Sequence, residues 1–194
     1  MSLTRLSALA GDTILPLAEA KQHLRVTHTD EDALIGSLRD ASVGYVERVS
    51  GVALAPAQFR WAIRRFPAQL TWGLGRFPQS PRIDLPMAPV TAIDAVAYED
   101  SNGVSQAYTT ARLVDNAAYP VADGSWPVAY NYAAVDFTAG LDSPTDAPDL
   151  LAAALLLLGH FYENRSAVSI FRGTVAELPL GVAALIDTYR KVLA

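Results

Sequence analysis

Apolar side chains recur every three or four residues near the N-terminus of this 194-residue chain, which is the spacing of a helix face. The first such stretch predicts a helix over Pro16–Val26, because proline suits the first turn of a helix. The second predicts a helix from an N-cap at Thr29 to Ser50, with Asp32 in capping-box position and Gly51 as the stop. Its apolar stripe consists of Leu34, Ile35, Leu38, Ala41, Tyr45, Val46 and Val49.

The C-terminal part has the same helical character. Asp142–Pro148 is a linker, and Asp146 or Asp149 can cap the next helix. That helix, Asp149–Asn164, is apolar on nearly every face, so we expect it at the centre of a bundle or between subunits. Residues 165–177 lack periodicity. A last helix is expected from Pro179 to about Leu193, with the stripe Val182, Leu185, Ile186, Tyr189, Val192 and Leu193.

The middle of the chain instead alternates between apolar and polar residues, which is the period of a strand. In Phe59–Arg64 the aromatic and aliphatic residues share one face and two arginines share the other. Glu99–Gly103 signals a hairpin, because Asn-Gly tolerates positive φ. Residues 66–81 are expected to form a long aromatic loop. The other expected strands are Arg82–Leu85, Val90–Ile93, Ala95–Tyr98, Gln106–Tyr108, Arg112–Val114, Val128–Tyr130 and Ala134–Thr138.

Together these patterns predict an α+β fold in which terminal helices form a helical bundle and a small antiparallel β-domain is inserted between them. The expected boundaries assign residues 1–51 and 141–194 to the bundle and residues 52–140 to the β-rich insertion.

Composition narrows the possible functions. The chain has 15 Lys and Arg, 20 Asp and Glu, a net charge of −5 and no cysteine. These values exclude a disulfide scaffold and thiol chemistry, and they argue against general binding to a phosphate backbone. Charged residues make up 18%, below the typical share of about 25%, which suggests surfaces meant for partners. The longest apolar run, residues 150–159, is half of a membrane span, so no membrane partner is expected.

A search for chemistry finds no nucleophile–base pair, metal-ligand frame or phosphate loop, so we expect neither an enzyme nor a cofactor. Helix capping explains the acids at residues 30–32 better than metal binding does. The arginines and aromatics of residues 59–66 resemble a single-strand binding surface, but strand alternation explains their spacing and the middle segment is slightly acidic. An alternative function is a carbohydrate- or ligand-binding module that uses Trp72, Phe77 and Trp126.

The order of several short motifs resembles one known family. The N-terminal motifs are Leu17–Lys21, His23–Val26 and Asp30–Ile35, and those of the β-rich part are Pro86–Val90, Tyr98–Gly103 and Asp136–Gly140. The C-terminal motifs are Phe161–Arg165, Leu178-Pro179, Gly181-Val182, Leu185 and Tyr189-Arg190. This ordered set is similar to the tailed-phage head–tail connector (neck adaptor) family, in its gp6-like or phiE125 gp8-like branch, which also occurs in prophages and gene transfer agents.

The resemblance implies a virion protein that assembles in the host cytoplasm into a ring, usually of twelve copies. Such a ring would lie under the portal protein, extend the DNA channel and present a docking surface for stopper or tail-completion proteins. DNA would pass through the lumen without sequence-specific binding. Twelve copies would carry a charge of about −60, and an acidic lumen would repel phosphate and let DNA slide.

Three groups of candidate site residues follow from this resemblance. Channel-facing acids are expected at Asp30, Glu31, Asp32 and Asp40. Ring contacts are expected at Leu34, Leu38, Tyr45, Leu151 and Leu155. Family-motif and portal-side candidates are Tyr162, Glu163, Asn164, Arg165, Ile170, Phe171, Arg172, Tyr189 and Arg190. We expect the segment 165–178 to become ordered on assembly.

Overall fold

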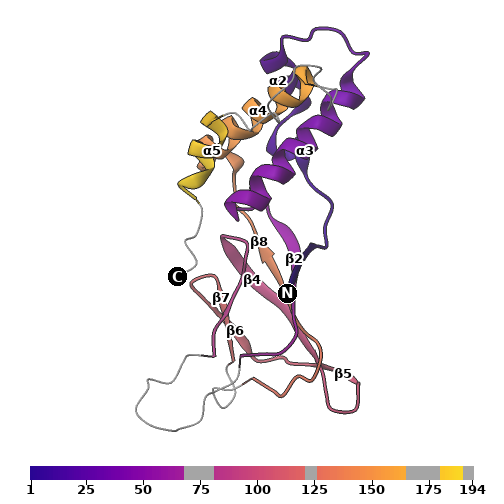
Figure 1. Cartoon of the computed structure of the whole chain (residues 1–194), viewed down its shortest axis with the longest axis vertical. Helices are drawn as coiled ribbons and strands as arrows, with labels where there is room; N and C mark the ends of the chain where they lie inside the picture. Colours follow the sequence, from indigo (N-terminus) through magenta and orange to yellow (C-terminus); the bar gives the residue numbers. More distant parts are fainter. Residues whose placement is uncertain (68–80, 121–125, 165–179, 190–194) are drawn as a thin grey trace, which may run out of the picture. The chain divides into compact units, whose positions relative to one another are not determined.

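The computed structural model describes residues 1–67, 81–120, 126–164 and 180–189. It divides into two compact units, each with its own core (Figure 1). The β unit comprises Met1–Ala8 and Pro56–Gly140, and the helical unit comprises Leu9–Ala55 and Leu141–Ala194. Helices and antiparallel sheets are both present, which confirms the α+β fold class.

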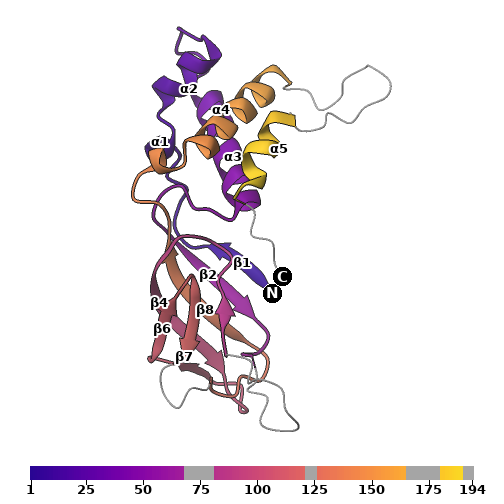
Figure 2. The same cartoon turned by 90° about the vertical axis from the view of Figure 1, so that its left-hand side faces the viewer.

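The N-terminal residues differ from the expectation that residues 1–51 belong to the helical part. Ser2–Arg5 forms strand β1, which pairs antiparallel with β2, Ala57–Ile63, and this places residues 1–8 in the β unit (Figure 2). Backbone hydrogen bonds hold these residues against β2, and Leu6 N, just after β1, also donates to Gln58 O at 2.8 Å. A four-residue strand with a partner so distant in sequence leaves little local pattern to detect.

Two antiparallel sheets make up the β unit. The first has the order β1-β2-β8-β4-β5, with β4 at Val90–Glu99, β5 at Ser105–Ala107 and β8 at Ala133–Ala139. The second has the order β3-β7-β6, with β3 at Ile83–Asp84, β6 at Ala111–Val114 and β7 at Ala117–Pro120. Phe59 pairs with Phe137 across β2 and β8, and their stacked rings lie 5.7 Å apart in the core.

Three strand predictions are corrected. Val90–Ile93 and Ala95–Tyr98 form the single strand β4, because two register irregularities let it bend without ending. Residues 128–130 form no strand, and β7 was not expected. The predicted hairpin at Glu99–Gly103 is confirmed between β4 and β5, with Gly103 at a φ of 77°.

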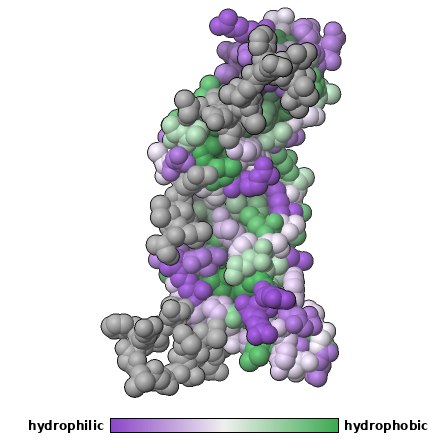
Figure 3. All heavy atoms as spheres, viewed as in Figure 1, coloured by the Kyte–Doolittle hydropathy of each residue, from purple (hydrophilic) through white to green (hydrophobic). Residues whose placement is uncertain are grey.

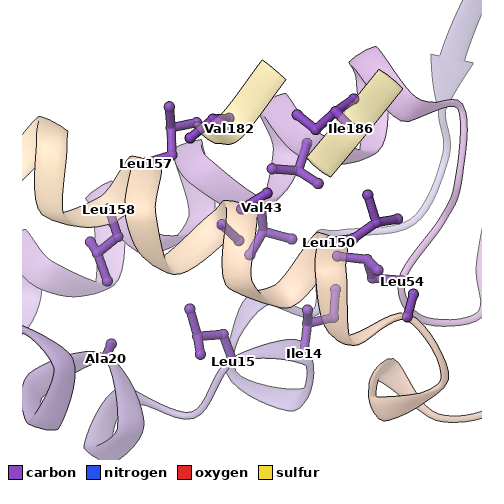
Figure 4. Close-up of a cluster of buried hydrophobic side chains, with 14 of the residues drawn as sticks. Ile14, Leu15, Ala20, Val43, Leu54, Leu150, Leu157, Leu158, Val182 and Ile186 are labelled. Atoms are coloured by element: carbon purple, nitrogen blue, oxygen red, sulfur yellow. The ribbon is translucent and has the colours of Figure 1, made fainter. Parts of the chain in front are cut away.

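The helical unit contains α1 (Gly11–Ile14), α2 (Leu17–Leu24), α3 (Asp32–Ser50), a 3₁₀ turn η1 (Pro144–Asp146), α4 (Pro148–Glu163) and α5 (Leu180–Asp187). As expected from its apolar sequence, α4 lies at the centre and contacts α2, α3 and α5. Its fully buried residues meet Val43 of α3 and Val182 and Ile186 of α5 (Figure 4). These residues of α4 are Leu150, Ala153, Ala154, Leu157 and Leu158.

The predicted helix caps are wrong in two places. At the start of α3 the N-cap is Glu31 and it makes no side-chain cap, while the Asp32 carboxylate accepts from Lys21 Nζ at 2.6 Å. At the start of α4 the N-cap is Ala147, again without a side-chain cap. The stop at Gly51 is confirmed, since Gly51 has a φ of 72° and its N–H donates to Glu47 O.

Candidate interaction surfaces

The four predicted channel-facing acids lie on or just before α3, but most of them have partners within the chain. Asp32 pairs with Lys21 of α2, and Asp40 accepts from Arg39 Nε at 2.9 Å. The Glu31 carboxylate accepts a hydrogen bond from the Tyr162 hydroxyl at the end of α4. Asp30 is exposed and precedes the helix. Part of the acidic charge at this end of the unit is therefore neutralised inside the chain.

A buried arginine joins α1 to α3 and was not anticipated from the sequence. Arg39 is 8% exposed, and its Nη1 donates to Asp12 Oδ1 at 2.7 Å while its Nε donates to Asp40. Gly11 makes room for this cluster, because a Cβ added there would lie 1.8 Å from Asp40 Oδ1. The cluster connects α1 to the middle of α3 through charge-assisted hydrogen bonds.

Net charge is divided unequally between the units. The β unit has seven basic and seven acidic residues, whereas the helical unit has eight basic and thirteen acidic residues. The whole net charge of −5 therefore lies on the helical unit.

The predicted ring-contact residues differ in how far they reach the solvent. Leu34 is 37% exposed, whereas Leu38, Tyr45, Leu151 and Leu155 are partly buried against the core of their own unit. These four side chains therefore stabilise the fold as well as being candidates for contact. Leu156, which the prediction omitted, is 43% exposed. On the face drawn in Figure 3, apolar residues reach the surface between polar ones in more than one place.

The portal-side candidates are described only in part. Asn164 Nδ2 donates to His160 O at 2.9 Å, Glu163 is exposed, and Tyr189 packs against the helical core. Arg165, Ile170, Phe171, Arg172 and Arg190 lie outside the described residues, as does the segment 165–178 that was expected to order on assembly. Within the described part, the Tyr162–Glu31 hydrogen bond connects the motif at the end of α4 to the start of α3.

Three aromatic side chains pack against one another in the β unit. Trp126 is 8% exposed, its ring stacks on Phe66 at 4.9 Å, and its Nε1 donates to Pro81 O. Tyr108 packs against the same ring at 5.4 Å. Trp126 is therefore a core residue rather than an open platform for a sugar, and the other two residues of that hypothesis, Trp72 and Phe77, lie outside the described part.

Two further features were searched for in the described part of the chain. No group of three or more His, Asp or Glu side chains there is arranged to hold a metal ion. None of the helices in those same ranges is long and apolar enough to cross a membrane.

Comparison with known proteins places the chain among particle neck proteins. The family model for the phage gp6-like head-tail connector protein matches residues 15–125. The neck of an empty GTA particle, computed with C6 symmetry, contains a chain that matches with a TM-score of 0.74 at 29% identity, covering 100% of this chain and 97% of that chain. The virion of a native gene transfer agent (GTA) particle gives a TM-score of 0.72 at 30% identity, with the same coverage.

A third structure, the neck of a native GTA particle computed with C12 symmetry, gives a TM-score of 0.70 at 29% identity and the same coverage. No curated protein sequence matches the chain. The chain belongs to the phage gp6-like head-tail connector family. It is a structural component of the neck of a phage-like particle and not an enzyme.

Proposed function

We propose that this protein forms a ring, with twelve copies in the assembled particle, beneath the portal protein. The ring extends the DNA channel and presents a docking surface to the stopper or tail-completion protein. The observation that carries the proposal is the full-length match to a chain from a neck with C12 symmetry. A ring of twelve identical subunits has this symmetry. Assembly takes place in the host cytoplasm before the tail is attached.

The charge distribution supports the channel role. Twelve copies bring a charge of about −60, all of it from the helical unit, and DNA phosphate is repelled by a wall of that sign. We propose that Asp30 contributes most among the four predicted acids, since Lys21 and Arg39 partly neutralise Asp32 and Asp40. DNA then slides through without sequence-specific contact.

The portal surface is proposed at the end of α4 and the residues around it. Glu163 is exposed there, and the Tyr162–Glu31 hydrogen bond connects the end of α4 to the residue before α3. Residues 165–178 would become ordered against the portal. Hydrogen exchange in the free and the portal-bound protein tests this part, and equal protection of the segment in both would contradict it.

Electron microscopy of the protein with and without its portal tests the main proposal. We expect a ring docked on the narrow end of the portal, with acidic side chains towards the lumen. The protein without the portal serves as the control, because such an adaptor can remain monomeric until it meets its partner. A portal that stays bare in the presence of excess protein, or a lumen lined with Lys and Arg, would contradict the proposal.

A further inference from the structure

A ridge of side chains runs along α3 between its buried and its exposed face. It consists of residues spaced four, three, four and three apart, namely Leu34, Leu38, Ala41, Tyr45 and Arg48. Leu34, Ala41 and Arg48 are exposed, and Leu38 and Tyr45 are half-buried. The Arg48 guanidinium lies over the Tyr45 ring at 5.8 Å. The ridge therefore presents apolar surface that ends in a cation at the C-terminus of the helix.

A second ridge runs along the solvent side of α4 and consists of Asp149, Ala152, Leu156, Gly159 and Glu163. Asp149, Ala152, Leu156 and Glu163 are exposed. A Cβ added at Gly181 of α5 would lie 4.0 Å from Leu156 Cδ1, so the glycine limits how far α5 covers this leucine. Towards its end the ridge is bordered by His23 of α2, 3.5 Å from a Cβ added at Gly159. Its most open part is Asp149–Leu156.

The two ridges match each other when the helices run in opposite directions. Starting from Arg48 and Asp149, the spacing along each ridge is three, four, three and four. Arg48 then faces Asp149, Tyr45 faces Ala152 and Ala41 faces Leu156. In the middle of the contact a large side chain therefore meets a small one, as Tyr45 does Ala152 and Leu156 does Ala41, which favours close packing of helix surfaces. The basic end of one ridge meets the acidic end of the other.

Symmetry sets the relative direction of these helices in neighbouring copies. Within one chain α3 and α4 are antiparallel, because Tyr162 near the end of α4 bonds to Glu31 at the start of α3. Leu141, shortly before α4, bonds to Ala53, shortly after α3. A twelvefold axis turns one copy into the next by about 30°. A rotation this small leaves α3 of one copy nearly antiparallel to α4 of its neighbour.

We infer that the α3 ridge of one copy packs against the α4 ridge of the next copy, with an ion pair between Arg48 and Asp149 across the contact. This contact rests on the proposed ring function and identifies its subunit interface. A cyclic ring needs two different, complementary surfaces on each subunit, and these ridges supply them. Leu156, which was not among the predicted ring contacts, is the central apolar residue of the α4 ridge in this contact. Both partners of the ion pair are exposed in the single chain.

A charge-swap series on the portal tests the contact. The measured quantity is the fraction of portals that carry a ring in electron micrographs. R48E places two like charges together at every subunit contact, and we expect it to reduce that fraction about tenfold. R48E/D149R restores the pair with reversed signs and should recover most rings. R48E/D94R is the matched control and should not, because Asp94 is an exposed acid of β4 that lies outside both ridges.

Thermal unfolding of each variant checks that the exposed substitutions leave the fold intact. Disulfide cross-linking gives an independent readout. The chain has no cysteine, so a disulfide can form only between introduced cysteines. A mixture of R48C and D149C chains on the portal should form disulfide-linked dimers under oxidation. Three results would overturn the contact while leaving the ring intact. They are normal ring formation by R48E, rescue by R48E/D94R but not by R48E/D149R, and no R48C–D149C cross-link in rings that form normally. Failure of the wild-type chain to form rings would overturn the proposed function, and this contact with it.

Discussion

Truncating two adjacent leucines of α4 distinguishes the contribution of the core from that of the surface. Leu157 is fully buried and packs with Val182 of α5 (Figure 4). Its neighbour Leu156 is 43% exposed. The perturbation is the same in both cases, namely truncation to alanine within one helix. Helix propensity is therefore affected equally, and any difference between the variants reports packing alone.

The structure gives different magnitudes for the two truncations. L157A removes buried methyl groups and leaves a cavity in a closed core, so we expect a loss of about 3 kcal/mol in the free energy of unfolding, within a range of roughly 2–5 kcal/mol. The corresponding fall in the unfolding midpoint is about 6–12 °C. L156A opens no closed cavity and should cost less than about 1 kcal/mol.

Urea unfolding followed by circular dichroism at 222 nm measures these losses. The signal at this wavelength comes from helices, and those of the described residues lie in the helical unit. The slope of the transition should stay constant, so that the midpoint alone reports stability. Equal losses in the two variants, or a loss below about 1 kcal/mol for L157A, would refute the assignment of α4 as the central helix. L156A should also weaken ring formation on the portal, which L157A at a permissive temperature should not do.

Three further predictions concern polar groups. E47A removes the buried acceptor of the Leu54 N–H, which bonds to Glu47 Oε1 at 2.9 Å, and should cost at least about 1–3 kcal/mol in urea unfolding. E47Q keeps an oxygen acceptor and should cost less, so an equal loss would contradict this reasoning. The buried Tyr108 hydroxyl has no hydrogen-bond partner in the described part of the structure, so Y108F should leave stability unchanged or raise it by up to about 1 kcal/mol, and a clear loss on the same assay would oppose this. Backbone N–H donation from Val104, with smaller effects from Gln106 and Asn102, lowers the pKa of Asp100 below its ordinary value of 3.8. The hairpin should therefore keep this stabilisation above pH 3.8 and lose it as the pH falls from there through the lowered pKa. An NMR titration of Asp100 measures it directly, and a pKa at or above 3.8 would contradict the assignment.

Local periodicity predicted the long helices well, because their signal lies in consecutive turns. An apolar stripe located α3 and a continuous apolar run located α4, and Gly51 marked the end of α3 through its left-handed conformation. The short strand β7 escaped notice because its turn uses Asp115 and Asn116 at positive φ instead of glycine. Asn116 also accepts from Val90 N, a contact that depends on the folded sheet.

The partners of the candidate acids could not be predicted from the sequence. Asp30, Glu31 and Asp32 look like helix-capping residues, but in the fold Asp32 binds Lys21 of α2. Arg39, which binds its neighbour Asp40, also binds Asp12 of α1. The contacts with Lys21 and Asp12 depend on how α2 and α1 pack on α3, which no local pattern encodes. The exposure of Leu156 was hidden in the same way, since a helix that is apolar on all faces does not reveal which face stays open.

The central claim is that copies of this chain form the ring between the portal and the next neck protein. The most direct test is a density map of the neck of the assembled particle, reconstructed without imposed symmetry, in which the copies of this chain are counted and located. The account predicts twelve copies in one ring under the portal, with α3 of each copy against α4 of its neighbour and acidic residues towards the channel. A map with this chain outside the portal–tail axis, or with no ring of it, would contradict the account.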